Sequence, residues 1–432
     1  MSHAPTPADA DRASAAIGPA ADPDAAALDA SDPLAPLRDR FVQGGDVVAY
    51  LDGNSLGRPL TRTAERLPSF VREQWGEGLI RSWDEEWMEL PFTLGDALGA
   101  AALGAAPGQT IVADSTTVLL YKLMRAALTA RPDRRRIVLD DDNFPTDRFL
   151  LEGIAREDGL ELDVITVDRT RGVSAEQLAA VLSDDTALVV LSHVAYRSGH
   201  LADMRELTRL AQESGALVLW DLCHSAGVVP TELDAWGVDL AVGCSYKYLN
   251  GGPGAPAFAY VRHELQGTIE QPIQGWMGAA DVFAMAETYR PADGMRRFLS
   301  GTPPVLGMQP IVDMVELVAE AGIDAIRAKS VALTEYTIRL VDEVLAPLGV
   351  AVASPRDSDE RGSHVTVTHP RFREVTAALW KRGVIPDFRS PDGLRIGLSP
   401  LSTSFAEVRL GIDAIRDELD LASRRDDAAT VG

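Results

Sequence analysis

The stretch DLAVGCSYKYLNGGPG, residues 239–254, contains a short apolar run, a lysine and then a glycine-rich loop. The run has the length and composition of a buried strand, and the glycines and proline after it favour a loop. Lys247 therefore follows a predicted strand closely. In open α/β sheets, ligands bind at the carboxyl ends of the strands, so the position of this lysine makes it a candidate functional residue.

Similar apolar runs lie on the N-terminal side of this stretch, and helix-length amphipathic segments separate them. In residues 204–214, for example, the apolar side chains of Leu207, Leu210 and Ala211 share one helical face. Buried strands that alternate with helices predict an α/β domain with a mainly parallel sheet. The predicted strands are residues 109–115, 135–141, 160–167, 186–194, 216–222 and 239–245.

Beyond about residue 300 the pattern changes to that of a smaller α+β unit. A turn at residues 301–304 precedes a long helical stretch over about 309–345. Two strands and a helix complete the predicted unit, at HVTVTHP (364–370), GLRIGLS (393–399) and about 373–382. We therefore predict a large domain over residues 31–300, whose first segment packs on the small domain, and a small C-terminal domain over residues 301–432.

The first thirty residues are rich in alanine, aspartate and proline and have few large apolar side chains. Such a segment cannot bury enough surface to fold, so we predict a disordered tail. It lacks the basic start and apolar stretch of a secretory signal, and no apolar run in the chain approaches the roughly 20 residues that span a bilayer.

The charge balance limits the kinds of partner. The 432 residues include 41 basic and 64 acidic side chains, a formal net charge of −23, which argues against nucleic acid or an anionic membrane surface as a partner. Cys223 and Cys244 are the two cysteines, and their spacing fits neither a disulfide framework nor a metal site. A cytoplasmic enzyme without a metal is the expectation.

Asp221 ends the predicted strand ALVLWDL, and His224 follows it by three residues. Asp221 and Lys247 are 26 positions apart, yet both are expected at the same sheet edge. Pyridoxal phosphate (PLP) chemistry needs such a pair, because a carboxylate keeps the pyridine nitrogen protonated while an amine bonds to the cofactor. Each residue alone has a simpler explanation, a surface lysine or a helix cap.

Two further segments match the needs of a phosphorylated, planar cofactor. Ser115, Thr116 and Thr117 follow a predicted strand and begin an apparent helix, where hydroxyl groups and backbone amides can bind phosphate. Phe144 and Asp147 follow another strand, and an aromatic ring there can stack on the cofactor. An ordinary N-cap and a packed Phe-Pro turn are the simpler explanations.

Several motifs together carry a resemblance to a known family. The chain resembles kynureninase, a fold-type I PLP enzyme related to the class V aminotransferases, from about residue 34 to 421. The most specific motifs are YLDGNSLG, DNFPTD and CSYKYLNGGPG, at residues 50–57, 142–147 and 244–254. Further matches are WGEGLIRSW (75–83), WDLCHSAG (220–227), GW (275–276), RGSHV (361–365) and GLRI (393–396).

The resemblance implies a role for each matching residue. Lys247 would be the Schiff-base lysine, Asp221 the partner of the pyridinium nitrogen and Tyr246 a proton donor, and these three form the implied catalytic set. Arg395 would receive the substrate α-carboxylate, a bidentate task suited to guanidinium. The implied cofactor contacts are Thr116, Thr117, Phe144, Asp147, Ser192, Asp221, His224, Tyr246, Lys247, Trp276 and Thr302, and the implied substrate contacts are Asn54, Ser55, Trp83 and Arg395.

The implied reaction is hydrolysis of the Cβ–Cγ bond of L-kynurenine, or of 3-hydroxykynurenine, which gives anthranilate or 3-hydroxyanthranilate and L-alanine. Trp276 and Thr302 match positions that reach the cofactor of a neighbouring subunit. The resemblance therefore also implies a homodimer with shared active sites.

Three positions depart from the family pattern. Met277 and Ala279 stand where related sequences carry phenylalanine and histidine, and Ser402 stands where bacterial relatives often carry tyrosine. Each change removes bulk near the expected aryl end of the substrate. The departures are explained either by a ring-substituted kynurenine as the substrate or by neutral drift with compensating side chains.

Two other functions are compatible with the fold. A desulfurase or related lyase shares the lysine but needs a mobile catalytic cysteine, whereas both cysteines lie in or beside predicted strands. The other is a regulatory module that binds PLP without catalysis, but the acidic charge and the lack of a fused DNA-binding segment argue against it.

Overall fold

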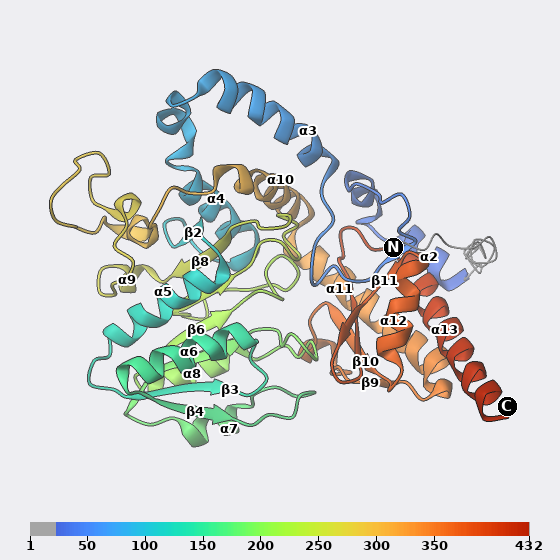
Figure 1. Ribbon diagram of the computed structural model, residues 1–432. Coiled ribbons are helices and arrows are strands. Elements are labelled where there is room, and N and C mark those ends of the chain that lie inside the picture. The colour runs from blue at the N-terminus through green and yellow to red at the C-terminus, as the bar shows by residue number, and fades with distance from the viewer. Residues whose placement is uncertain (1–22, 432) are drawn as a thin grey trace, which may run out of the picture.

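The computed structural model describes residues 23–431 of the chain, with side chains as far as residue 425. A seven-stranded sheet, in the order β2-β8-β7-β6-β5-β3-β4, forms the centre of the larger unit (Figure 1). Its strands are β2 (Thr110–Ala113), β3 (Arg136–Asp140), β4 (Glu161–Ile165), β5 (Thr186–Ser192), β6 (Leu217–Asp221), β7 (Leu240–Gly243) and β8 (Ala257–Val261).

The sheet confirms the predicted mainly parallel arrangement. Neighbouring strands from β4 to β7 run parallel, while β8 runs antiparallel to both β7 and β2. The six predicted strands all form, but the sequence analysis missed β8, whose five residues are fully buried. Its run AFAYV is short and directly follows the glycine-rich loop, so it gave no separate strand signal.

Alternate residues of each strand pack on opposite faces of the sheet. In β6, Val218 and Trp220 join one apolar core, whereas Leu217 and Leu219 join the other. This period of two follows from the pleat of an extended chain. Helices α4 (Leu90–Leu98), α8 (Met204–Glu213) and α10 (Val305–Ala321) cover the first face, and α5 (Thr116–Thr129) and α6 (Pro145–Asp158) cover the second.

A smaller unit contains the third core and a four-stranded antiparallel sheet, in the order β12-β13-β10-β9. Figure 1 shows it beside the large sheet domain, with helices packed on its strands. Its elements are α11 (Ile323–Leu340), β9 (Ala351–Val352), β10 (His364–Thr368), α12 (Phe372–Lys381), β11 (Val384–Ile385), β12 (Asp387–Arg389), β13 (Gly393–Gly397) and α13 (Phe405–Val431).

The long helix expected over residues 309–345 is two helices instead. Gly322, with φ 79°, separates α10 from α11, and this left-handed conformation suits glycine. Because α10 packs in the large domain's core, that core extends past the boundary predicted near residue 300. Strand β1 (Ala49–Tyr50) pairs with β11, so an N-terminal segment contacts the small unit.

The N-terminal tail was predicted to be disordered as far as residue 30. Residues 1–22 lie outside the described part, but Pro23–Ser31 forms helix α2, so the prediction is wrong for this segment. Asp29 accepts hydrogen bonds from the backbone N–H groups of Phe405 and Ala406, at the start of α13. Composition failed here because a short helix is stabilised by tertiary contacts rather than by its own sequence.

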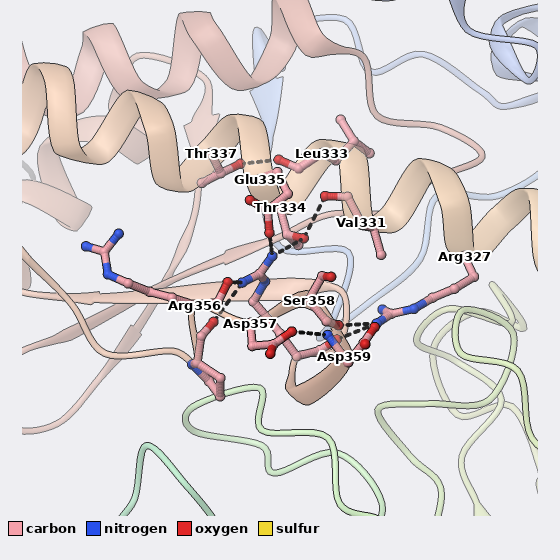
Figure 2. A network of polar contacts seen from close by, with 12 residues as sticks. Arg327, Val331, Leu333, Thr334, Glu335, Thr337, Arg356, Asp357, Ser358 and Asp359 are labelled. Atoms are coloured by element: carbon pink, nitrogen blue, oxygen red, sulfur yellow. Dashed lines mark hydrogen bonds and ion pairs between the residues drawn. The ribbon is translucent and has the colours of Figure 1, made fainter.

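A polar network attaches the loop before β10 to helix α11 (Figure 2). Arg361 is fully buried and donates hydrogen bonds to the carbonyl groups of Pro355 and Arg356, while Arg327 donates to the carbonyl of Ser358. On its other side the loop bonds to the large domain, because the N–H of Leu201 donates to the carbonyl of Glu360. The loop thus links the small domain to the segment that follows β5.

Among residues 23–431, no helix has both the length and the apolar character needed to cross a bilayer.

Candidate active site

Three neighbouring strands deliver polar side chains to one edge of the large sheet. Ser192 ends β5 and lies in register with Asp221, which ends β6. Lys247 follows β7 by four residues, in a loop closed by a hydrogen bond from the N–H of Asn250 to the carbonyl of Lys247. The predicted meeting of Asp221 and Lys247 at this edge therefore occurs.

The Lys247 amine lies among aromatic and imidazole groups. Its Nζ is 2.9 Å from Nε2 of His224, and 5.9 Å and 5.8 Å from the ring centroids of Phe144 and Tyr246. The Phe144 ring contacts the edge of the Tyr196 ring, with centroids 5.3 Å apart. An amine and an aromatic face thus border the same space, the arrangement that a planar ligand bonded to the lysine requires.

These groups line a cavity of about 110 Å³. It contains nine of the residues that the sequence analysis assigned to the cofactor: Thr116, Thr117, Phe144, Asp147, Ser192, Asp221, His224, Tyr246 and Lys247.

Five further residues line this cavity and were missed. Two of them, Thr146 and Cys223, lie inside motifs that had already been recognised, so the motifs were the available signal. Tyr196 comes from the loop after β5, where no sequence pattern marked it. The others are Leu120 and Val194.

Burial changes the protonation of the cavity's side chains. It raises the pKa of Asp147 well above its usual value, and the nearby carboxylate of Asp221 adds to this rise. Burial and the charge of Lys247 hold the pKa of His224 well below its usual range, so its imidazole is neutral. Oδ2 of Asp147 and Nδ1 of His224 are both buried without a hydrogen-bond partner. Such atoms are costly to leave unpaired, which favours a polar ligand in the cavity.

The start of α5 supplies a site for an anion. The helix begins at Thr116, and the side chain of Ser115 makes no capping hydrogen bond. The first N–H groups of a helix have no partner within the helix and carry partial positive charge. Because Thr116 and Thr117 also line the cavity, this helix end can receive a phosphate group there.

The chain has four lysines, and their surroundings differ. Lys122 and Lys329 are buried in ion pairs, 2.6 Å from Asp114 and 2.7 Å from Asp32. Lys381 is exposed on α12. Lys247 is the one whose amine borders a cavity that also contains a strand-end carboxylate, so it is the candidate for covalent attachment of a cofactor.

Arg395 lies apart from these nine residues, in a cluster on the small domain. Its guanidinium contacts Asp387 at 2.6 Å, the hydroxyl of Ser55 at 2.9 Å and the carbonyl of Tyr196 at 2.7 Å. Two predicted substrate contacts, Ser55 and Arg395, are thus in direct contact. Asn54 is fully buried next to Ser55, and both polar atoms of its amide lack a hydrogen-bond partner.

The motif at residues 50–57 connects the two groups of residues. The N–H of Gly57 donates to the carbonyl of Tyr246, and a Cβ at Gly57 would lie 2.4 Å from the carbonyl oxygen of Lys247. At the other end, a Cβ at Gly397 in β13 would lie 1.8 Å from Oδ1 of Asn54. A side chain at Gly57 would collide with the backbone of the Lys247 loop, and one at Gly397 would collide with the buried amide of Asn54.

The remaining predicted residues lie elsewhere on the subunit. Trp83 and Trp276 line another hollow, of about 440 Å³, with Ile80 and Phe283. Trp276 is 46% exposed, and Thr302 is exposed just before α10. Neither residue borders the Lys247 cavity of its own chain.

Met277 was expected near the aryl end of the substrate, and the structure does not place it in contact with a ligand. Its side chain is 0% exposed and packs in the core with Phe298 and Leu299, so it has no surface with which to touch a ligand. Ala279 is half-buried and Ser402 is buried, and neither lines the Lys247 cavity. The replacement of phenylalanine by Met277 therefore changes the packing of the core rather than the lining of the Lys247 cavity.

The cysteines are fixed in the structure. Cys223 lies two residues after the end of β6 and Cys244 directly follows β7, and the backbone N–H of Cys244 contacts Sγ of Cys223 at 3.2 Å. The hydrogen bond with the neighbouring thiol of Cys244, together with burial, raises the pKa of Cys223 well above its usual value. Both cysteines are held at the sheet edge by these contacts, whereas a desulfurase needs a mobile catalytic cysteine.

Comparison with solved structures identifies the fold. A cysteine desulfurase from Thermococcus onnurineus aligns with a TM-score of 0.77 at 18% identity, over 89% of this chain and 98% of that one. A C-DES variant with glycine covalently linked to its PLP cofactor aligns with a TM-score of 0.78 at 19% identity, over 88% and 99%. The chain therefore has the fold of the fold-type I PLP enzymes.

Sequence comparison identifies the family within that fold. The kynureninase of Pseudomonas fluorescens is 42% identical over 92% of this chain and 95% of its own length, and that of Burkholderia pseudomallei is 42% identical over 93% and 96%. A model of the kynureninase C-terminal domain matches residues 326–415. The chain belongs to the kynureninase family.

Proposed function

We propose that the protein binds PLP on Lys247 and hydrolyses the Cβ–Cγ bond of L-kynurenine or 3-hydroxykynurenine. The products are anthranilate or 3-hydroxyanthranilate and L-alanine. The observation that carries the proposal is the cavity at the sheet edge, where Lys247 and Asp221 meet in a chain of the kynureninase family.

The residues of the cavity fit this cofactor. Thr116 and Thr117 at the start of α5 would hold the phosphate, with Tyr246 beside them, and the Phe144 ring would stack on the pyridine. Asp221 would bind the pyridine nitrogen. The unpaired atoms of Asp147 and His224 would gain polar partners at the edge of the ring, joined by Ser192. Bound PLP supplies an electron sink for the negative charge that develops on the substrate.

The side chains around the cofactor would handle the protons of the reaction. The Lys247 amine would remove the proton from Cα, and His224 beside it is a poor base because burial holds the pKa of its imidazole well below its usual range. Burial raises the pKa of Tyr246 well above its usual value, so its phenol stays protonated and would be able to donate a proton to Cβ, which receives the electron pair of the broken bond. Arg395 would bind the α-carboxylate, and Asn54, Ser55 and Trp83 would contact the rest of the substrate.

A homodimer with shared active sites is the second part of the proposal. Several large apolar side chains are exposed along residues 75–88 and 273–285: Ile80 is 77% exposed, Met285 73% and Phe283 63%. Exposed apolar surface of this extent is typical of an interface. A second copy packed there would cover it and would bring Trp276 and Thr302 to the partner's cofactor.

This activity would belong to the kynurenine pathway of tryptophan catabolism, whose 3-hydroxylated branch leads to NAD biosynthesis. A cytoplasmic location agrees with the two free cysteines.

The test is release of fluorescent anthranilate from L-kynurenine by the purified, PLP-loaded protein. A panel that adds 3-hydroxykynurenine and ring-substituted analogues would rank the substrates by kcat/KM. We expect the highest value for one of the first two compounds. Absence of any aryl product with the whole panel, or release of sulfide from L-cysteine instead, would contradict the proposal.

A further inference from the structure

The small-domain sheet places three charged side chains on one face. Asp387 of β12 and Arg395 of β13 are directly opposite each other in an antiparallel pair. Arg389 lies two residues beyond Asp387, so its side chain points to the same face. Oδ2 of Asp387 accepts hydrogen bonds from Nε of Arg395 and Nε of Arg389, both at 2.7 Å. One carboxylate is therefore shared between two guanidinium groups.

The hydrogen-bond donors of Arg395 are almost all in use. A guanidinium has five N–H groups. Nε and Nη2 of Arg395 contact Oδ2 of Asp387, Nη2 also donates to Ser55 Oγ, and Nη1 donates to the Tyr196 carbonyl. The Arg395 side chain is only 1% exposed. A second carboxylate cannot form two hydrogen bonds to this guanidinium until one of the present partners leaves.

Asp387 is the partner that an incoming carboxylate would displace. Both groups are anions, so holding them on one guanidinium costs electrostatic repulsion, whereas Ser55 and the Tyr196 carbonyl are neutral. Asp387 also has an alternative partner, because Arg389 already contacts it. The Arg389 side chain is 36% exposed and the Asp387 side chain 18%, so both lie nearer to solvent than Arg395.

We propose that Asp387 is an internal stand-in for the substrate carboxylate, which it yields to the substrate while Arg389 takes over its charge. This inference rests on the proposed role of Arg395 in binding the substrate. Asp387 and Arg389 are positioning residues rather than catalytic ones. The exchange makes a carboxylate on the ligand a condition of contact with Arg395, because a neutral ligand cannot replace Asp387 there.

The exchange predicts opposite effects for two variants. Asp387→Asn removes the competing anion, so carboxylate ligands bind more tightly. Arg389→Gln removes the alternative partner and leaves Asp387 on Arg395, so they bind more weakly. We expect about a fivefold change in dissociation constant in each direction, since partly exposed ion pairs contribute modestly. The change appears in KM for L-kynurenine, while kcat stays within twofold.

The probe is 4-(2-aminophenyl)-4-oxobutanoate, which keeps the carboxylate and aryl ketone of the substrate but lacks the amine that reacts with the cofactor. Its dissociation constant is measured by calorimetry on the PLP-loaded protein. Arg373→Gln is the matched control, because it removes a positive charge that stacks on Phe388 between Asp387 and Arg389 without contacting Asp387. A second probe keeps the amine and aryl ketone of the substrate but lacks the carboxylate. Its dissociation constant should be the same for the wild type and for every variant.

Weaker probe binding by Asp387→Asn would overturn the proposal, because it would mean that Asp387 only holds Arg395 in position. If that variant fails to fold, Arg389→Gln decides alone, and binding equal to that of Arg373→Gln would refute the exchange. Failure of the proposed function is distinct: the wild-type protein would then release no anthranilate, whatever the calorimetry of the carboxylate probe shows.

Discussion

The Lys247 cavity and the Arg395 cluster differ in how their polar groups are satisfied. In the cavity, Oδ2 of Asp147 and Nδ1 of His224 are buried and unpaired, whereas the Arg395 guanidinium makes four contacts to protein groups. The cavity suits a permanently bound cofactor, because the unpaired polar atoms of Asp147 and His224 would gain hydrogen-bond partners when it binds. The Arg395 cluster suits a substrate that binds and dissociates in each turnover, because binding to Arg395 requires one of its present partners to leave.

The largest effect is expected for Lys247→Ala. We expect release of anthranilate to fall at least about a thousandfold, because the residue that holds the cofactor and moves the α proton is lost. The visible absorbance of the purified protein should disappear with it. Lys381→Ala, on the exposed face of α12, is the control and should keep both properties. A variant that retains more than a tenth of wild-type activity would refute the role of Lys247.

Tyr246→Phe tests the protonated phenol of the cavity. Loss of a general acid lowers the rate by about a hundredfold or more, and we expect this loss in kcat rather than in KM. Stopped-flow and steady-state kinetics on L-kynurenine would measure it, with Tyr121→Phe, at a half-buried position of α5 outside the cavity, as the control. An unchanged kcat would remove Tyr246 from the catalytic set.

Arg395→Lys tests the Arg395 cluster. Lysine keeps the charge but cannot make two parallel hydrogen bonds, so we expect kcat/KM to fall about thirtyfold, equivalent to about 2 kcal/mol. The loss should be absent with a substrate analogue that has no carboxylate. Arg356→Lys, in an exposed pair with Asp342, is the control. Equal losses with both ligands would show that the variant damages the fold instead.

Asp52 offers a further contrast, because it is a buried carboxyl beside the paired cluster and has a hydrogen bond only with Ser55 at its side chain. Burial raises its pKa to about 6, and Oδ1 has no hydrogen-bond partner. Between about pH 4 and 6 the folded state keeps a proton that the unfolded state has lost, so stability falls as the pH rises. Asp52→Asn should remove up to about 1.4 kcal/mol per pH unit of this slope.

The measurement for Asp52 is urea unfolding between pH 4.5 and 6.5. Asp39→Asn, at an exposed position, is the control and should keep the wild-type slope. An identical slope in wild type and Asp52→Asn would show that the Asp52 carboxyl has an ordinary pKa in the folded state.

The two regions also differ in how far the sequence predicts them. The cavity's residues follow strands in one sheet, so the rule that strand ends converge was enough to bring Asp221 and Lys247 together. The cluster depends on contacts between Arg395, Ser55 and the Tyr196 carbonyl, which come from three distant segments. No periodic pattern encodes such contacts, and Asp387 looked like any other surface carboxylate in the sequence.

A match to a family motif does not show which way a side chain points, because packing in the folded chain determines its orientation. Met277 was expected near the aryl end of the substrate because it stands where related sequences carry phenylalanine, yet its side chain is fully buried in the core that also contains Leu299. The alanine-rich sequence of helix α2 also gave no sign of its structure, because the helix is held by contacts with distant segments such as α11 and α13.

The most direct test of the proposed cofactor site is chemical identification of the lysine that carries PLP. The PLP-loaded protein is reduced with borohydride and digested, and the modified peptide is located by mass spectrometry. We predict a phosphopyridoxyl group on Lys247 at about one per chain, with Lys122, Lys329 and Lys381 unmodified. A modification on one of those three lysines, or a reduced protein that carries none, would contradict the account.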